Sequence, residues 1–444
     1  MPGFSAAVRR LVVAVRRHGW PAVQWGAVWP VALAVFVVGG GLWLAVPSSG
    51  RQVSVTAEAM WGPTLEQVRP SATGDVDPRL AGAVDAILAR RAIAVKTNNL
   101  QLFLWDVAPE LRAEQRPVFQ NMRKLGLNVT YRRAEPWVNY EAVRRYGLAT
   151  GTFRVTMRYQ VAGTRLAQAS TDVGYTYTVR EGRLYLVDDD DLDRAIGSNR
   201  QPWDYGPIDV VRRKNVLVVV NQGRVPLANQ LADQTVAMAP KVRRLWRGPL
   251  QLVPMIVAMR EPGVLTNLPP TLPADEPARV QAMPSPSESG RPVGGWVVIR
   301  PEDQQKFDSA EMTHALMHLL PVRLGEEAPR WLAEGMAQYA ENLQLVTAGR
   351  GKEVAAHRAA VREHSLGDLT RLPADDEFTT TDSDDISWLA VERLIQQAGL
   401  TAVTDFYLQV ARRGYNDYAR ERLLVEYTGL TEADLVESLR SLAG

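Results

Sequence analysis

Two helical patterns separated by a proline dominate the second half of the chain. Residues 309–320 place apolar side chains at helical spacing, and His314 and His318 stand four residues apart, which puts both imidazoles on one face of a helix. A proline follows, and a second helical pattern over residues 330–345 carries Glu334. The pattern predicts two neighbouring helices that bring two imidazoles and a carboxylate within reach of one another.

Cysteine is absent from the chain, and histidine is rare. The missing thiols exclude disulfides, a thiol nucleophile and cysteine-ligated zinc. Imidazole nitrogens and carboxylate oxygens remain as zinc ligands. Besides the pair in the first helical pattern, the histidines are His18, His357 and His364. The last two lie in a charged helical pattern, which favours solvated side chains.

Two short sequence motifs resemble those of a known family. Residues 311–314 read Glu-Met-Thr-His, and residues 331–335 read Trp-Leu-Ala-Glu-Gly. Both motifs resemble those of the gluzincin metallopeptidases, in particular their membrane-anchored actinobacterial, peptidase MA-like relatives. Members of that family carry H-E-x-x-H on one helix and a glutamate ligand on the next. The resemblance implies a zincin domain with a zinc ion in a peptide-binding cleft.

The preferred alignment matches Glu-Met-Thr-His at residues 311–314 to the second half of the family motif. It makes Glu311 the candidate general base, His314 and Glu334 metal ligands, and it puts Ala310 where the family has its first histidine. Alanine has no lone pair, so this degraded motif is expected to bind zinc weakly or not at all. His318 is a candidate substitute ligand, but it lies about 12 Å along the helix from residue 310.

A second alignment takes His314 and His318 as the two histidines and puts Ala315 in the place of the base. Neither alignment is complete. This favours a catalytically impaired pseudo-peptidase that keeps a cleft for a peptide or protein ligand. The alternative is an active zinc metallopeptidase with a rearranged ligand set, and a purely structural surface protein is a third hypothesis.

The N-terminal residues predict a membrane anchor. Residues 1–25 are basic, and residues 26–47 form an uncharged apolar run that is long enough to cross about 30 Å of hydrocarbon. The positive-inside rule then puts residues 1–25 in the cytoplasm and the main domains outside the cell membrane, on a single-pass helix. A cleaved signal peptide is the alternative, which the length of the run disfavours. Residues 48–76 are expected to be a juxtamembrane linker.

Residues 77–205 show helical patterns followed by strands with alternating apolar side chains, which is typical of half-buried antiparallel sheet. The expected strands are 127–133, 151–161, 172–180 and 183–187. Helices followed by such a meander resemble the cone-shaped nuclear transport factor 2 (NTF2-like) domains. The acidic run at residues 188–191 lacks the spacing of a calcium loop and is expected to be a solvated turn.

Residues 206–444 are expected to form the gluzincin-like domain, so the predicted fold class is α+β. Its expected strand, helix and strand are 216–220, 226–246 and 250–259. Residues 261–292 are rich in proline and predict a mobile loop, and residues 295–299 predict an edge strand that pairs with substrate. Residues 350–444 predict a helical subdomain. The net charge of +2 disfavours nucleic acid as a partner, and the oligomeric state stays open.

Overall fold

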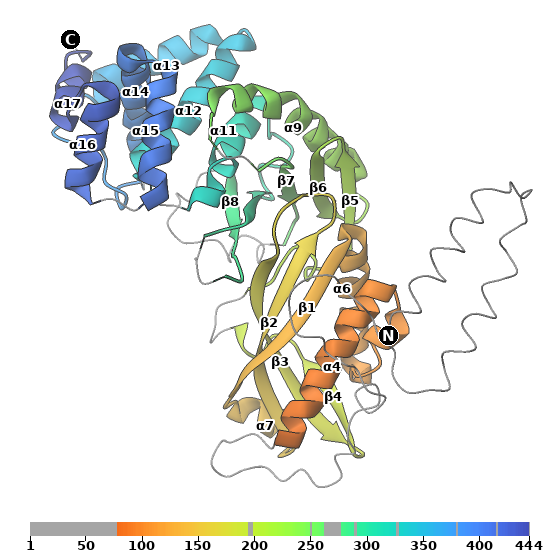
Figure 1. Ribbon diagram of the computed structural model, residues 1–444. Coiled ribbons are helices and arrows are strands. Elements are labelled where there is room, and N and C mark those ends of the chain that lie inside the picture. Colours follow the sequence, from red (N-terminus) through yellow and green to blue (C-terminus); the bar gives the residue numbers. More distant parts are fainter. Residues whose placement is uncertain are drawn as a thin grey trace, which may run out of the picture. The chain divides into compact units, whose positions relative to one another are not determined.

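The computed structural model describes residues 78–193, 199–248, 251–261, 277–287, 291–325, 328–378, 381–413 and 416–443 (Figure 1). The predicted cytoplasmic segment, membrane span and juxtamembrane linker, residues 1–76, lie outside the described residues. Within the described ranges, no helix is both long and apolar enough to cross a membrane. The described residues form a mixed α+β structure with two sheets and many helices.

The first sheet is an antiparallel meander in the order β1-β2-β3-β4, preceded by helices. The elements are α4 (Pro78–Thr97), α5 (Leu100–Phe103), α6 (Arg112–Leu125), β1 (Leu127–Trp137), α7 (Tyr140–Tyr146), β2 (Thr150–Val161), β3 (Ala169–Arg180) and β4 (Arg183–Asp188). All four predicted strands are confirmed. The short α7 was not predicted, because two turns of helix are too few to show a periodic pattern.

Alternation along β2 shows why this sheet forms. Phe153, Val155 and Met157 are buried, whereas Arg154 between them is exposed and Thr156 is partly exposed. Side chains two residues apart in a strand share one face, so the apolar set covers the side on which α4 and α6 pack. Burial of this face supplies the hydrophobic stabilisation of the first half of the chain.

The second sheet has the order β5-β6-β7-β9-β8. Its strands and the helix between them are β5 (Ile208–Arg213), β6 (Val216–Asn221), α9 (Val225–Leu245), β7 (Met255–Ala258), β8 (Ala278–Met283) and β9 (Gly294–Ile299). The three central strands are parallel, and the strands at both edges are antiparallel to their neighbours. The central strands are almost wholly apolar because both of their faces are covered.

Two expectations about this sheet were wrong. Residues 278–283 of the predicted mobile loop form β8, which pairs with β9 along its whole length. The predicted edge strand, β9, therefore lies inside the sheet, and β8 forms the edge. The prolines around β8 hid it in the sequence, since they lower the strand signal of their surroundings without preventing an edge strand between them.

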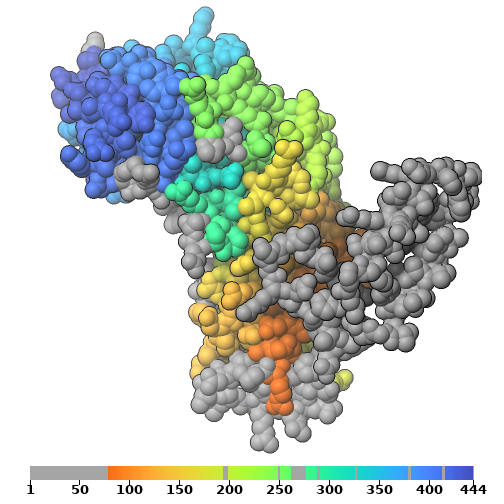
Figure 2. Space-filling view, in the orientation of Figure 1, coloured from red at the N-terminus to blue at the C-terminus, as the bar shows by residue number. Residues whose placement is uncertain are grey.

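The remaining elements are helical, and those after residue 350 gather in one mass in the space-filling view (Figure 2). They are α11 (Ser309–Leu319), α12 (Arg330–Thr347), α13 (Gly351–His364), α14 (Thr381–Ala398), α15 (Leu400–Arg413), α16 (Asp417–Thr428) and α17 (Glu432–Arg440). The helices α11, α12 and α14 pack together in one hydrophobic core with α9. This packing fixes the positions of the side chains on α11 and α12.

A carboxyl group in the segment that joins β4 to β5 makes the folding stability depend on pH. The Asp204 side chain accepts a hydrogen bond from the backbone N–H of Gln201 at 2.8 Å. Burial raises the pKa of Asp204 to about 7, against the lowering effect of this bond and of Arg200. The folded protein therefore keeps a proton on Asp204 that the unfolded chain releases near pH 4, so folding stability falls between pH 4 and pH 7.

Replacement of this carboxyl by an amide tests that dependence. We expect Asp204→Asn to gain about 2–3 kcal/mol of stability relative to the wild type between pH 5 and pH 8, because the amide carries no charge to bury. Urea unfolding at the two pH values measures this difference. A wild type that gains stability relative to the variant as the pH rises would contradict the assignment.

Candidate metal centre

The first helix of the site begins at a capping box. The Asp308 side chain accepts hydrogen bonds from the backbone N–H groups of Ala310 and Glu311, at 2.7 and 3.1 Å. The Glu311 carboxylate accepts a hydrogen bond from the backbone N–H of Asp308 in return, at 2.7 Å. These bonds satisfy free donors at the start of α11 and hold the Glu311 carboxylate at the helix terminus.

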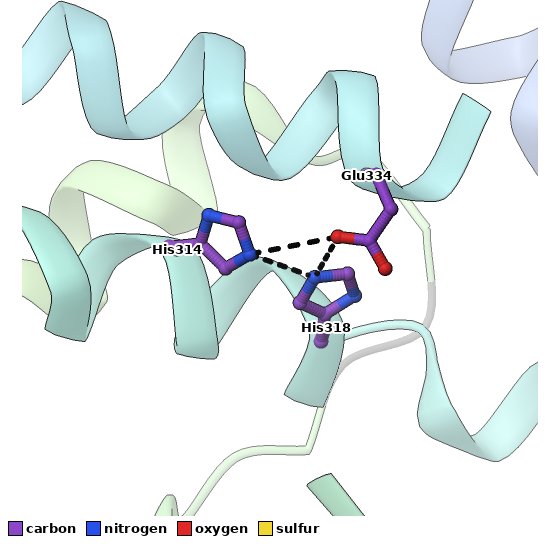
Figure 3. Close-up of side chains that lie close together, drawn as sticks. All are labelled: His314, His318 and Glu334. Carbon is purple, nitrogen blue, oxygen red and sulfur yellow. Dashed lines mark hydrogen bonds and ion pairs between the residues drawn. The ribbon is translucent and has the colours of Figure 1, made fainter. Parts of the chain in front are cut away.

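Three potential ligands converge between α11 and α12 (Figure 3). The Nε2 atoms of His314 and His318 lie 3.1 Å apart. The Oε2 atom of Glu334 lies 3.1 Å from Nε2 of His318 and 3.6 Å from Nε2 of His314. The Glu334 side chain is only 3% exposed, while both imidazoles are partly exposed. The trio therefore combines a buried carboxylate with two imidazoles that solvent can reach.

These distances fit a zinc ion. Zinc binds imidazole nitrogen and carboxylate oxygen at about 2.0–2.2 Å, so two donors at a tetrahedral zinc lie about 3.3 Å apart. The three separations in the trio, from 3.1 to 3.6 Å, bracket that value. Three protein ligands leave a fourth position for water or substrate. The side chains of His314, His318 and Glu334 would thus hold zinc with an open position.

A further carboxylate orients one imidazole. The Nδ1 atom of His314 lies 2.9 Å from Oε2 of Glu341, which follows Glu334 by seven residues on α12. A hydrogen bond from Nδ1–H to this carboxylate leaves the lone pair of Nε2 free to face the trio. Glu341 therefore fixes the tautomer and the ring orientation that a metal ligand needs.

The charges of the site agree with this geometry. Burial alone would lower the pKa of His314, but the carboxylates of Glu334 and Glu341 outweigh burial and raise this pKa well above its usual value. Burial alone would raise the pKa of Glu334, but the charge of His318 and hydrogen bonds from both imidazoles hold it well below its usual range. A metal ion would take the place of a proton on His314.

The structure sorts the residues of the two sequence alignments. It brings together His314, His318 and Glu334, the histidine pair of the second alignment with the expected glutamate. Ala310 is buried in the first turn of α11, and the Glu311 carboxylate belongs to the capping box. Burial raises the pKa of Glu311, against the backbone hydrogen bond from Asp308. Its role as a general base stays a prediction.

Two residues near the trio were missed in the sequence. Glu341 could have been found, because a spacing of seven residues puts it on the same face of α12 as Glu334. Tyr407 on α15 had no such signal. Burial and the charge of Glu334 raise the pKa of Tyr407, which marks it as a neighbour of that carboxylate from a distant part of the chain. Contacts of this kind depend on how the helices pack.

Other predicted polar residues are engaged elsewhere. The Nε2 atom of His357 lies 2.7 Å from Oδ1 of Asp385, and its ring stacks on Trp388, so this half-exposed imidazole is not simply solvated as expected. In the acidic run, Asp188 accepts hydrogen bonds from the hydroxyl of Tyr146 and from two backbone N–H groups. These bonds give that carboxylate a structural role at the end of β4.

Solved structures of zinc peptidases are among the proteins to which this chain is similar. No protein-family model matches the chain, and no curated protein matches it. Among solved structures, it is similar to an M1 zinc metallopeptidase from Deinococcus radiodurans, with a TM-score of 0.34, 15% identity, and coverage of 71% of this chain and 63% of that chain. A mutant of that enzyme bound to a Tyr-Ser-Ala substrate gives a TM-score of 0.33, 18% identity, and coverage of 66% and 61%.

Native yeast LTA4 hydrolase gives a TM-score of 0.34 with 8% identity, over 69% of this chain and 65% of that chain. The chain spans about three fifths of the length of the first of these structures. At such TM-scores the likeness is coarse.

Replacement of Glu341 by glutamine tests its part in the site. We expect Glu341→Gln to weaken zinc binding about 10- to 100-fold, because a neutral amide holds the His314 ring less firmly and makes it a weaker ligand. Competition with a chromophoric chelator measures the affinity. Glu363→Gln on the exposed surface of α13 is the matched control and should bind as the wild type does. Equal affinities for both variants would contradict the role of Glu341.

Proposed function

We propose that residues 206–444 form a zinc-binding, peptidase-like domain that is impaired in hydrolysis and keeps a cleft for a peptide or protein ligand. The observation that carries this proposal is the trio of His314, His318 and Glu334, whose donor atoms lie at the separations of a three-ligand zinc site. The open fourth position is where a ligand carbonyl or carboxylate would bind.

The missing base supports the impairment. When bound, zinc lowers the pKa of a water molecule and polarises a carbonyl, but peptide hydrolysis also needs a side chain that accepts the proton of that water. The residue after His314, where the resemblance expects the base, is Ala315, and it is buried in the core. The nearby carboxylates have other roles, since Glu341 binds His314 and Glu311 caps α11.

An active metallopeptidase is the second candidate, and one observation favours it. Burial raises the pKa of the half-buried Glu311 carboxyl, as a general base near neutral pH requires. To serve in that way, Glu311 would have to leave the backbone N–H of Asp308 and turn toward the trio. The ligand set would then be the rearranged one, with His318 in place of the missing histidine.

We further propose that residues 26–47 anchor the chain in the cell membrane, with residues 1–25 in the cytoplasm and the NTF2-like and peptidase-like domains on the outer side. The arginines before the apolar run support this orientation. The bilayer and a peptide or protein ligand would then be the partners of the chain.

Metal content and peptide hydrolysis, measured together, test the proposal. The full chain in detergent micelles is dialysed against a weak chelator, and zinc and cleavage of a mixed fluorogenic peptide library are then quantified. We expect about one zinc per chain and no cleavage above that of the metal-stripped sample. Absence of zinc would overturn the proposed site. Zinc-dependent cleavage that Glu311→Gln abolishes would establish the active alternative.

A further inference from the structure

Exposed apolar side chains are concentrated in one short segment of the first half of the chain. Trp137, Val138, Tyr140 and Leu148 are 45%, 56%, 76% and 70% exposed. Of the twelve large hydrophobic residues that are exposed in the described ranges, these four fall within twelve consecutive positions. Single exposed apolar residues are ordinary, but such a cluster marks an interaction surface. We call these four residues the apolar tip.

The apolar tip lies at one end of the four-stranded sheet. Trp137 is the last residue of β1 and pairs with Thr152 near the start of β2. Asn139 caps α7, which carries Tyr140, and Leu148 lies between α7 and β2. The end of β1, the short helix α7 and the residues that follow it therefore lie at the same end of the sheet (Figure 1).

The described chain enters at this same end of the sheet. The helix α4 begins at Pro78, and the side chain of Leu80 in its first turn lies beside Gly151 of β2. One turn further on, Asp85 forms an ion pair with Arg133 of β1 at 2.8 Å. The residues that link α4 to the proposed anchor thus start next to the apolar tip.

Few residues separate the proposed anchor from the first described helix. The 30 residues from 48 to 77 separate the apolar run from α4. A chain of 30 residues reaches about 100 Å at most, so the proposed anchor would keep the first domain near the bilayer. The end of the sheet at which α4 begins is then the end that is tethered.

We propose that the apolar tip inserts into the interfacial region of the phospholipid bilayer that the anchor crosses. This inference rests on the proposed anchor for its location. Trp and Tyr favour the membrane interface, where the ring is apolar and the N–H or O–H stays hydrated, and Leu and Val add apolar area. A tip held in this way fixes the orientation of the first domain at the membrane.

The charged residues near the apolar tip nearly balance, so burial of apolar side chains would drive its binding to the membrane. The exposed charged residues on the same segment are Arg132, Glu135, Glu141, Arg144 and Arg145. Two acids beside three arginines nearly balance, and Arg145 also faces Asp188 at 3.3 Å. The attraction to anionic lipids is therefore weak, and we expect insertion to persist at high salt.

Spin labels at single cysteines test the insertion. The chain has no native cysteine, so Val138→Cys and Leu148→Cys can each be labelled at one site in the full chain, reconstituted in phosphatidylcholine vesicles. Tyr418→Cys on α16, where the native side chain is 80% exposed, is the matched control. We expect labels at 138 and 148 to collide several-fold more with oxygen than with a water-soluble nickel chelate, and the reverse at 418.

The outcomes separate the tip from the anchor. Labels at 138 and 148 that behave as the one at 418 would overturn the insertion. Labels shielded from both reagents would overturn it in favour of a second copy or another protein. Extraction of the chain by alkaline carbonate, with labels at 138 and 148 that oxygen reaches at neutral pH, would contradict the proposed anchor and support insertion of the apolar tip. A chain that resists extraction, with labels at 138 and 148 exposed to water, would contradict insertion of the apolar tip and support the anchor.

Discussion

Replacement of His318 by alanine is expected to remove stoichiometric zinc, whereas Ala310→His should leave the zinc content unchanged. The Nε2 atom of His318 lies 3.1 Å from both partner atoms of the trio, so its loss leaves two ligands. Loss of a residue that only orients a ligand costs about 10- to 100-fold in metal affinity, so loss of a ligand itself should cost more than about 100-fold. Zinc per chain after dialysis against a weak chelator measures the effect.

This experiment decides between the two alignments of the motif. His364→Ala, an exposed residue at the end of α13, is the control and should retain full zinc. Retained zinc in His318→Ala, together with zinc gained only in Ala310→His, would restore the alignment in which Ala310 replaces the first ligand. His318→Ala decides the matter even if a histidine at the buried position 310 prevents folding.

Replacement of Gly335 by alanine is expected to lower the stability of the folded chain by about 3 kcal/mol. An added Cβ would lie 2.3 Å from the carbonyl oxygen of Ser387 and 2.6 Å from Cγ2 of Val391, so α12 and α14 would have to move apart. Backbone cannot yield as a flexible side chain can. Thermal unfolding should show a fall in Tm of roughly 6–12 °C.

Gly367→Ala is the control for this substitution. An added Cβ at Gly367 meets no atom within 4 Å, and the residue has no positive φ, so its Tm should stay within about 1–2 °C of the wild type. The Gly335→Ala chain should also bind zinc more weakly, because Glu334 precedes the displaced residue. An unchanged Tm in Gly335→Ala would mean that the two helices are not packed as closely as described.

Much of the secondary structure could be predicted because it depends on short-range periodicity. The alternation in β2 and β3 and the helical spacing in α11 and α12 are visible in the residues themselves. The capping box of Thr431 and Asp434 is likewise a feature of a few neighbouring residues. The strand β8 escaped prediction, because flanking prolines obscured a pairing that only its neighbour β9 supplies.

The candidate site was also predictable only in part from the sequence. The sequence named His314, His318 and Glu334, because a spacing of four residues and a Trp-Leu-Ala-Glu-Gly phrase are local features. The motif at residues 311–314 favoured the alignment with Glu311 as the base over the alignment that uses His318 as a ligand. Only the packing of α11 against α12 shows which imidazoles meet the carboxylate, and it assigns the Glu311 side chain to the helix cap.

The sequence by itself determined the two helices, their histidine pair and glutamate, and the strands of the first sheet, because each follows from the spacing of side chains along a few turns or one strand. The tertiary structure alone decided the order of the second sheet, the 2.9 Å contact between Glu341 and His314, and the gathering of the apolar tip beside the start of α4. These depend on residues far apart in the chain, and their distances are set when helices and strands pack and exclude water.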